Sequence, residues 1–339
     1  MHYIGVDHHK QYSYLTVLDE DGSLVKEGRV LNIRSEVKKF LEVVGEDSEA
    51  VIEAGRSTYT MLELLEGLGM GVKIAHPRGV QMIAHAQIKT DKRDSEVLAQ
   101  LLRMGMIPEV YQRDKSNREG QRVLRHRAYY VAARTKVKNR IRWLLAQQSE
   151  EVRFKAERFS NIFSREGRKF LKTWDLPGRD KELMAALLKT YNHLEDRVKE
   201  SDELVKRLYK EMREAQLIDS VPGFATFMSV LVAVEIGDIK RFPKVGNLHS
   251  YAGVIPSTHS SGDKNYHGRI VKARNRWLSW ALVEAVHPAL KVDHDLRVFY
   301  DRIRRRKGHN TAKVATARRL LTIIYKILKE KRPYVLYKR

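Results

Sequence analysis

Two short apolar segments early in the chain each end in an acidic residue. Residues 3–7 end in Asp7, and residues 50–53 end in Glu53. Apolar runs of this length are typical of buried strands in a sheet. Because functional side chains in open α/β sheets gather where strands end, we expect Asp7 and Glu53 to lie at such an edge.

Strand and helix signals alternate through the rest of the first 109 residues. Further strands are predicted over Ser13–Leu18, Leu24–Leu31 and Gly71–Ala75, and a helix over Ser57–Leu68. This order indicates an α/β domain in which helices flank a mixed sheet.

A further pair of acids, Asp91 and Asp94, stands at a predicted helix start among the basic residues Lys89, Lys92 and Arg93. Their i, i+3 spacing places both carboxylates on one helix face, one turn apart. An N-cap followed by a first-turn acid is the ordinary explanation of this spacing. The alternative is half of a metal site, completed by acids from elsewhere in the chain.

The charge balance favours that alternative. The chain has 64 Lys and Arg against 42 Asp and Glu, a net charge of +22, which predicts a nucleic-acid partner held through its phosphates. In such a protein a cluster of Asp7, Glu53, Asp91 and Asp94 would repel the substrate unless a cation intervened. These four acids are therefore predicted to bind Mg²⁺, which prefers oxygen ligands.

Other metal and redox chemistry receives less support. The chain has no cysteine, which excludes thiolate zinc sites, disulfides and thiol nucleophiles. The pair His8-His9 adjoins Asp7, but a histidine pair at a strand end more often serves the structure than a metal. No apolar segment is long enough to span a membrane and no signal-peptide pattern is present, so a cytoplasmic protein without a membrane partner is expected.

One long helix is predicted over residues 117–148, with nearly all of its charges positive. A charged helix face is usually only solvated, but Tyr129, Tyr130 and Trp143 are interleaved here, and bases can stack on aromatic rings. We therefore predict that this helix contacts nucleic acid. The predicted contact residues are Arg118, Arg122, Arg125, Arg134, Lys138 and Arg142.

Three domains are predicted: residues 1–150, residues 151–214 and residues 215–339. Residues 151–178 look irregular, whereas residues 179–214 carry apolar side chains at heptad-like spacings. That pattern fits either a coiled-coil arm or a long helix packed on its own domain. These apolar residues are Leu183, Leu187, Leu194, Val198, Val205, Leu208 and Met212.

The last domain is predicted to be mainly helical. The turn Val221–Phe224 between two helices is similar to a helix-hairpin-helix turn, which presents backbone N–H groups to phosphates. Residues 257–264 form a Ser/Gly-rich stretch of the kind normally found in a loop. The tail supplies a second basic face that includes Arg304 and Arg305.

Short motifs spread over nearly the whole chain occur in a specific order and spacing. They are Gly5-Val6-Asp7 with Lys10, Glu53-Ala54-Gly55 with Tyr59, Lys89-Thr90-Asp91 with Asp94, Val221-Pro222-Gly223, Glu235-Ile236-Gly237-Asp238, Tyr251-Ala252-Gly253, Ser261-Gly262, Gly268 and Asn275. In this set the chain resembles the DEDD transposases of insertion sequences, recombinases guided by a bridge RNA.

The resemblance implies a RuvC-like N-terminal domain of the RNase H type, with Asp7, Glu53, Asp91 and Asp94 as its metal-binding acids. It further implies a C-terminal transposase domain whose serine nucleophile maps onto Ser261, with Ser260 as the rival. Donor and target DNA, a guide RNA and a dimer or tetramer are the implied partners. Nearby cations would stabilise the charge of the reacting phosphate; these are Lys264, Arg269 and Lys272.

The sequence departs from the family pattern at Lys92, Ser95, Arg274 and His8-His9, none of which removes an expected catalytic group. Two other functions stay open on residue chemistry alone. One is an RNase H-fold nuclease or Holliday-junction resolvase in which water attacks. The other is a non-catalytic nucleic-acid-binding protein whose acids are only helix caps.

Overall fold

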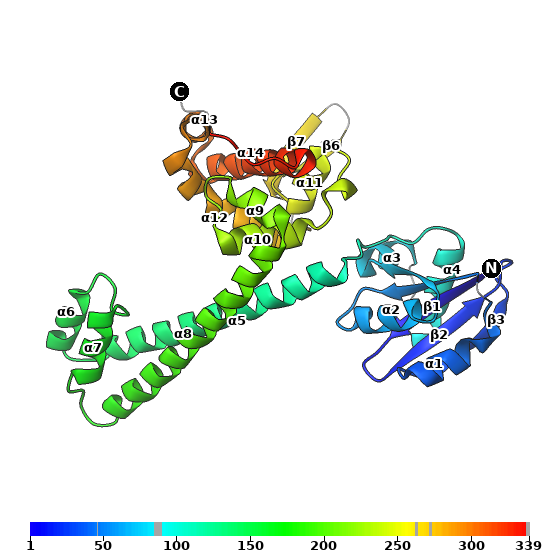
Figure 1. Ribbon diagram of the computed structural model, residues 1–339, viewed down its shortest axis with the longest axis horizontal. Helices are drawn as coiled ribbons and strands as arrows, with labels where there is room; N and C mark the ends of the chain where they lie inside the picture. Colours follow the sequence, from blue (N-terminus) through cyan, green and yellow to red (C-terminus); the bar gives the residue numbers. More distant parts are fainter. Residues whose placement is uncertain (46, 85–89, 262–263, 271–272, 337–339) are drawn as a thin grey trace. The chain divides into compact units, whose positions relative to one another are not determined.

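The computed structural model describes residues 1–45, 47–84, 90–261, 264–270 and 273–336. Lys89 and Lys272 lie outside the described residues. The chain divides into two compact units, Met1–Arg113 and Asp114–Arg339, which are described separately below (Figure 1). None of the helices that the structure describes is long and apolar enough to cross a membrane.

The first unit is built on a five-stranded sheet in the order β3-β2-β1-β4-β5. Strand β1 runs antiparallel to β2 and parallel to β4, and β5 is parallel to β4. This mixed sheet confirms the predicted α/β domain and is compatible with an RNase H-like fold. The strands are β1 (His2–His8), β2 (Tyr12–Leu18), β3 (Leu24–Leu31), β4 (Ser48–Glu53) and β5 (Gly71–Ala75).

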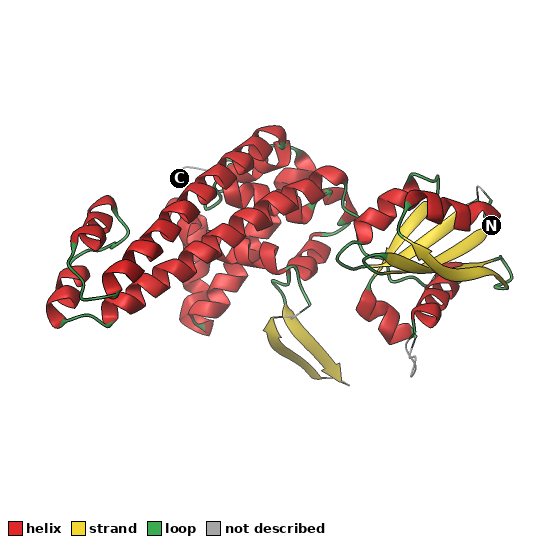
Figure 2. Ribbon diagram, turned by 90° about the horizontal axis from the view of Figure 1, so that it is seen from below, coloured by secondary structure: helices red, strands yellow, loops and turns green. Residues whose placement is uncertain are grey.

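Helices cover both faces of this sheet (Figure 2). Because successive strand residues face opposite sides, Ile4 and Ile52 pack with the α2 side, whereas Val51 packs with Leu98 of α4. The helices of this unit are α1 (Arg34–Phe40), η1 (Leu41–Val43), α2 (Thr58–Glu66), α3 (Pro77–Ile83) and α4 (Asp91–Arg103).

The second unit begins with a long hairpin of two 32-residue helices, α5 (Lys115–Ala146) and α8 (Asp180–Glu211). The prediction of an irregular stretch between them is wrong, because this stretch contains two helices, α6 (Glu150–Glu157) and α7 (Arg165–Thr173). Their short amphipathic sequences are helical because they close a small core at the tip of the hairpin.

Helix α8 packs along α5 of the same chain, as one of the two predicted arrangements requires. Its buried side chains include the predicted Val198 and Val205. In the first half the predicted seam is one residue out of place: Leu183 is exposed, and Met184 is buried instead. The tip core of α6 and α7 covers that side of the helix.

The rest of the second unit is a helical domain around α10, in which residues 229–236 are all buried. Its elements are α9 (Arg213–Asp219), α10 (Thr226–Ile236), η2 (Ile239–Arg241), α11 (Val245–Ala252), β6 (Pro256–Ser261), β7 (Lys264–Ile270), α12 (Arg276–Val292), α13 (His294–Lys307) and α14 (His309–Glu330). The Ser/Gly-rich stretch that was expected to be a loop therefore belongs to the β6–β7 hairpin.

Gly223 lies between α9 and α10 with a φ of +94°, a conformation that favours glycine. A Cβ atom at this position would lie 2.3 Å from the backbone oxygen of Ala285 in α12. Close packing between helices therefore accounts for this glycine, and the helix-hairpin-helix function stays a prediction.

Candidate active site

Gly5 allows α4 to lie directly on β1. A Cβ atom at this position would lie 1.9 Å from the backbone oxygen of Ser95 and 2.6 Å from the nitrogen of Ala99. The buried hydroxyls of Thr16 and Ser95 share a hydrogen bond of 2.7 Å in the same contact. Close packing at Gly5 thus sets where the first turn of α4 stands relative to the end of β1.

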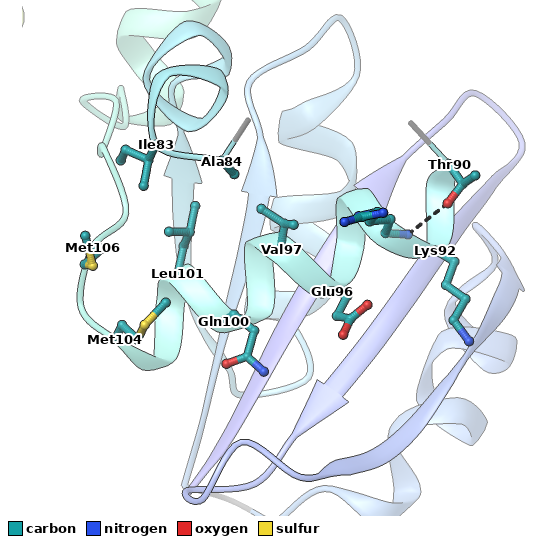
Figure 3. A pocket seen from close by; sticks show the side chains of 11 residues that line it. Ile83, Ala84, Thr90, Lys92, Glu96, Val97, Gln100, Leu101, Met104 and Met106 are labelled. Atoms are coloured by element: carbon teal, nitrogen blue, oxygen red, sulfur yellow. Dashed lines mark hydrogen bonds between the residues drawn. The ribbon is translucent and has the colours of Figure 1, made fainter. Parts of the chain in front are cut away.

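Thr90 caps the start of α4, so Asp91 is not the N-cap that the ordinary explanation of the Asp91–Asp94 spacing requires. The Thr90 hydroxyl accepts a hydrogen bond of 3.2 Å from the backbone of Arg93 (Figure 3). Asp91 and Asp94 occupy the first turn. Lys92 turns to the sheet, where it pairs with Glu27. A hollow of about 650 Å³ lies along another side of α4, and the described residues that line it include none of the four acids.

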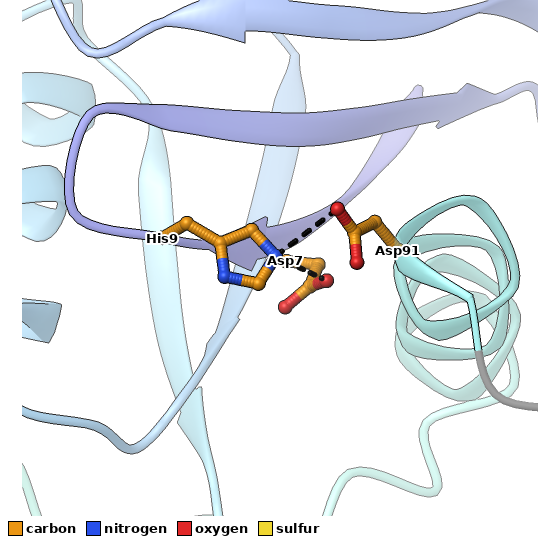
Figure 4. A group of neighbouring side chains, drawn as sticks. All are labelled: Asp7, His9 and Asp91. Carbon is orange, nitrogen blue, oxygen red and sulfur yellow. Dashed lines mark ion pairs between the residues drawn. The ribbon is translucent and has the colours of Figure 1, made fainter.

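The side chains of Asp7, His9 and Asp91 meet at the end of β1 (Figure 4). One potential ligand atom from each lies within 4.8 Å of the others. The His9 Nε2 atom is 3.2 Å from an oxygen of Asp7 and 3.2 Å from an oxygen of Asp91. The structure therefore brings together the ends of two elements that are more than 80 residues apart in the sequence.

Glu53 and Asp94 stand beside this group without belonging to its closest set of atoms. Ile52 pairs with Val6 in the parallel ladder, so Glu53 ends its strand beside Asp7. Asp94 follows Asp91 by one turn of α4. All four predicted acids thus belong to the first unit, at or beside the β1 end.

Two residues of this site were not predicted. His9 follows Asp7 by two positions in extended backbone, which places both on one side of the strand. His8 turns to the opposite side, where its Nδ1 lies 2.8 Å from the Ser13 hydroxyl and burial lowers its pKa. The two-residue spacing between Asp7 and His9 was the available signal, whereas the adjacent histidines were interpreted as a structural pair.

Tyr12 is the second missed residue. Its hydroxyl donates a hydrogen bond of 3.1 Å to Asp91, and this bond raises the pKa of Tyr12. The Tyr12 ring also lies 4.8 Å from the His9 ring, centre to centre, and the guanidinium of Arg29 covers it at 3.7 Å. Tyr12 therefore orients both Asp91 and His9.

The donor set suits a divalent cation. Two carboxylates and one imidazole nitrogen converge, and carboxylates are the common feature of Mg²⁺ and Mn²⁺ sites. The His9 Nε2 atom is buried and has no hydrogen-bond partner among the described residues, and it lies 3.2 Å from an oxygen of each carboxylate. An inward-facing nitrogen in that position fits a metal ligand.

Helix α5 divides its positive charges between two faces. On the inner face, Arg127 pairs with Asp202 at 2.5 Å and Arg134 pairs with Glu195 at 2.9 Å. Lys138 lies near the Phe163 and Tyr191 rings, and desolvation lowers its pKa. The structure thus places the predicted contacts Arg134 and Lys138 against other parts of the second unit.

Arg125 belongs to a buried network. It pairs with Glu235, which is 2% exposed, and lies over the Trp277 ring at 3.9 Å. The Asn275 amide donates to the other Glu235 oxygen at 2.7 Å, and the Tyr251 hydroxyl donates to the Glu235 backbone at 3.2 Å. The motif residues Glu235, Tyr251 and Asn275 therefore join α5, α10, α11 and α12.

An outer face of α5 remains in contact with solvent. Exposed cations and aromatic residues recur there at spacings of three, four and seven residues, which place them in one stripe along the helix. Within this stripe the Arg140 guanidinium covers the Trp143 ring at 4.0 Å. We call this stripe the exposed basic face of α5: Arg122, Tyr129, Lys136, Arg140 and Trp143. The predicted residue Arg142 is also exposed, whereas Arg118 is half-buried.

The remaining predicted residues belong to the second unit. Ser260 and Ser261 end β6, where Ser260 is opposite Asn265 and Ser261 is opposite Lys264. Arg269 is part of β7, while Arg304 and Arg305 are exposed on α13.

Comparison with known proteins gives a consistent result along the chain. A model of DEDD transposases of the IS110 type matches residues 4–149, and a model of the IS116/IS110/IS902 transposase family matches residues 215–301. A protein of insertion element IS116 from Streptomyces clavuligerus is 26% identical and aligns over 97% of this chain and 95% of its own length. The IS1111A transposase of Coxiella burnetii is 24% identical over 98% of this chain and 90% of its own.

Proposed function

Because this chain belongs to the IS110/IS116 family of insertion-sequence transposases, we propose that it cuts and rejoins DNA with a serine nucleophile assisted by Mg²⁺ at a four-acid site. Membership of the family makes the protein an enzyme of DNA transposition and implies a divalent metal. The serine, the choice of Mg²⁺ and a guide RNA are our proposals for how it acts.

The proposed metal ligands are Asp7, Glu53, Asp91 and Asp94. The proposal is supported by the convergence of Asp7 and Asp91, and by Glu53 and Asp94 standing beside them. When bound, Mg²⁺ would stabilise the negative charge that develops on the reacting phosphate. Tyr12 would hold Asp91 in place through its hydrogen bond.

Ser261 is the proposed nucleophile, with Ser260 as its rival. Its hydroxyl oxygen forms a bond to the DNA phosphorus as the bond to one deoxyribose oxygen breaks. The serine loses a proton, and the departing oxygen gains one, so the products are a phosphoserine ester and a free DNA hydroxyl. Rejoining is the reverse attack by a DNA hydroxyl. The cations Lys264 and Arg269 belong to the same hairpin, and Lys272 follows it in the sequence.

A guide RNA is proposed to select donor and target DNA, on an oligomer of two or four chains. The exposed basic face of α5 supports contact with nucleic acid, because three cations and two aromatic rings lie on it together. RNA sequencing of the purified protein would test the guide, and light scattering would test the oligomer.

The single observation that carries the metal-site proposal is the meeting of Asp7, His9 and Asp91 at the β1 end. The test of the chemistry is to incubate the protein with DNA carrying the element ends, denature it, and search for a peptide–DNA adduct. The adduct is expected on Ser261 or Ser260 and should disappear in the matching alanine variant. If both alanine variants still cleave DNA in a Mg²⁺-dependent way and neither forms an adduct, water is the attacking group instead.

A further inference from the structure

The second unit contains a large hollow bounded by α13, α14 and the base of the β6–β7 hairpin. Its volume is about 1120 Å³, slightly above the usual range of pockets that enclose small ligands. Among the described residues that line it, every charged or titratable side chain is basic: His249, Lys307, Arg318 and Arg319. A ligand of this hollow is therefore expected to be an anion.

The walls add a second requirement. Val254, Phe299, Ile303 and Val314 are apolar, while Asn310 and Thr311 offer hydrogen bonds. A phosphate needs cations and donors but gains nothing from apolar walls. A nucleobase fits such walls, because its faces are apolar and its edges form hydrogen bonds.

A smaller hollow of about 300 Å³ continues along α13 and shares Ile303, Lys307, Thr311 and Ala315 with the larger one. It adds the cations Arg302 and Arg306, and its described lining also contains no acid. The two hollows together form what we call the α13–α14 groove. Its shape and charge suit an extended polyanion rather than a single phosphate.

The groove leads to the hairpin that carries the proposed nucleophile. Pro256 at the start of β6 and Gly268 of β7 line the larger hollow. Ser261 ends the same strand, five residues beyond Pro256. At the rise of an extended strand this is about 16 Å, a distance of several nucleotides.

We propose that the α13–α14 groove binds the DNA strand to be cut and takes up one of its nucleotides with the base unpaired. Arg318 and Arg319 would contact the phosphates, and the apolar wall would receive the base. Bases of an intact duplex are stacked inside it, so the groove should favour single-stranded over duplex DNA. This inference rests on the proposed function only for its statement of which strand is bound.

The test uses the full-length Ser261→Ala protein in EDTA, so that neither cleavage nor metal binding affects the result. Reversing two groove charges, with Arg318→Glu and Arg319→Glu, should weaken binding of a 20-nucleotide single strand at least tenfold in low salt. The slope of log affinity against log salt should become shallower by about 1.4, as expected for two lost phosphate contacts.

The matched control makes the same charge change on exposed positions of α14 that do not line the groove, with Lys326→Glu and Lys329→Glu. It should retain most of the single-strand affinity. Equal losses in the two double variants would overturn the groove, because general electrostatic attraction would then explain both.

A third variant fills the groove without changing its charge. Ala315 lines both hollows, and Ala315→Phe should remove the preference for single strands over duplex while leaving the salt dependence unchanged. If the Ala315→Phe protein still prefers single-stranded to duplex DNA, the proposal is contradicted. It is also contradicted if this variant loses affinity only for a single-stranded RNA of the same sequence. If Ala315→Phe dissociates an oligomer while single-strand binding persists, the groove is a subunit interface instead. Failure to find the protein–DNA adduct would count against the proposed serine nucleophile, but not against strand binding in the groove, which is measured without cleavage.

Discussion

Glu235 in the second unit and the pair Asp7 and Asp91 in the first unit are carboxylates in opposite surroundings. In the second unit, Glu235 is 2% exposed, and its two oxygens meet Arg125 and Asn275. In the first unit, the side chains of Asp7 and Asp91 are 17% and 42% exposed and share His9 between them. The second unit thus surrounds a buried anion with fixed partners, whereas the first unit brings two anions together at an accessible edge of the sheet.

The difference separates a structural carboxylate from a candidate ligand. Removing water from Glu235 is offset by a guanidinium and an amide that cannot easily leave. Bringing Asp7 close to Asp91 is unfavourable for two anions, and a divalent cation would reverse the sign of that interaction. Substitutions at the two places should therefore have opposite consequences for stability and activity.

The largest expected effect follows from Asp91→Asn. This change keeps the size of the side chain but removes one anionic ligand, so DNA cleavage should fall by roughly a thousandfold, the scale of a lost charge-stabilising group. The melting temperature should stay level or rise, because repulsion with Asp7 is relieved. Cleavage assays and calorimetry measure the two quantities. Glu96→Gln, an exposed change on the same helix, is the control and should leave cleavage intact.

The opposite pattern is expected for Glu235→Ala. It leaves the Arg125 guanidinium without its buried partner and should lower the free energy of unfolding by about 3–5 kcal/mol. Urea unfolding followed by circular dichroism measures this loss. Glu203→Ala breaks an exposed pair with Lys206 and should cost less than about 1 kcal/mol. Similar losses for both variants would show that the buried network is not special.

Gly5→Ala should affect both stability and the metal site. The added methyl group cannot fit beside the Ser95 backbone oxygen, so α4 must move and carry Asp91 with it. Overpacking of this kind typically costs about 1–3 kcal/mol. Metal affinity, measured by titration calorimetry, should fall even though no ligand has been changed. The control is Gly71→Ala, because a methyl group at this position meets only ordinary contacts. Gly69 is less suitable as a control because its positive φ disfavours alanine.

The smallest effect is expected on the exposed basic face of α5. Lys136→Glu with Arg140→Glu should weaken nucleic-acid binding and reduce the salt slope by about 1.4–1.8, without unfolding the protein. By contrast, Arg134→Glu places an anion against Glu195 and should destabilise the second unit. Binding titrations at several salt concentrations, together with unfolding curves, distinguish the faces. An unchanged slope for the outer pair would exclude this surface from binding.

Much of the first unit could be predicted because its signals are local. The strand Gly71–Ala75 ends where the apolar run ends, and α4 begins at Asp91, where a helix start is predicted. His9 was missed because its role depends on α4, which is more than 80 residues away in the chain. Which arginines of α5 face inward could not be predicted either. Positive charges surround that helix, and acids on α8 and α10, such as Glu195 and Glu235, select the inner ones.

The central claim is that the edge formed by Asp7, His9 and Asp91 binds a divalent metal. Electron paramagnetic resonance of bound Mn²⁺, used as a probe for Mg²⁺, tests it directly. We predict a Mn²⁺ site that Mg²⁺ displaces, with a coupling to a histidine nitrogen that His9→Gln removes and with binding that Asp91→Asn abolishes. Mn²⁺ that binds equally well to the Asp91→Asn protein would contradict the claim.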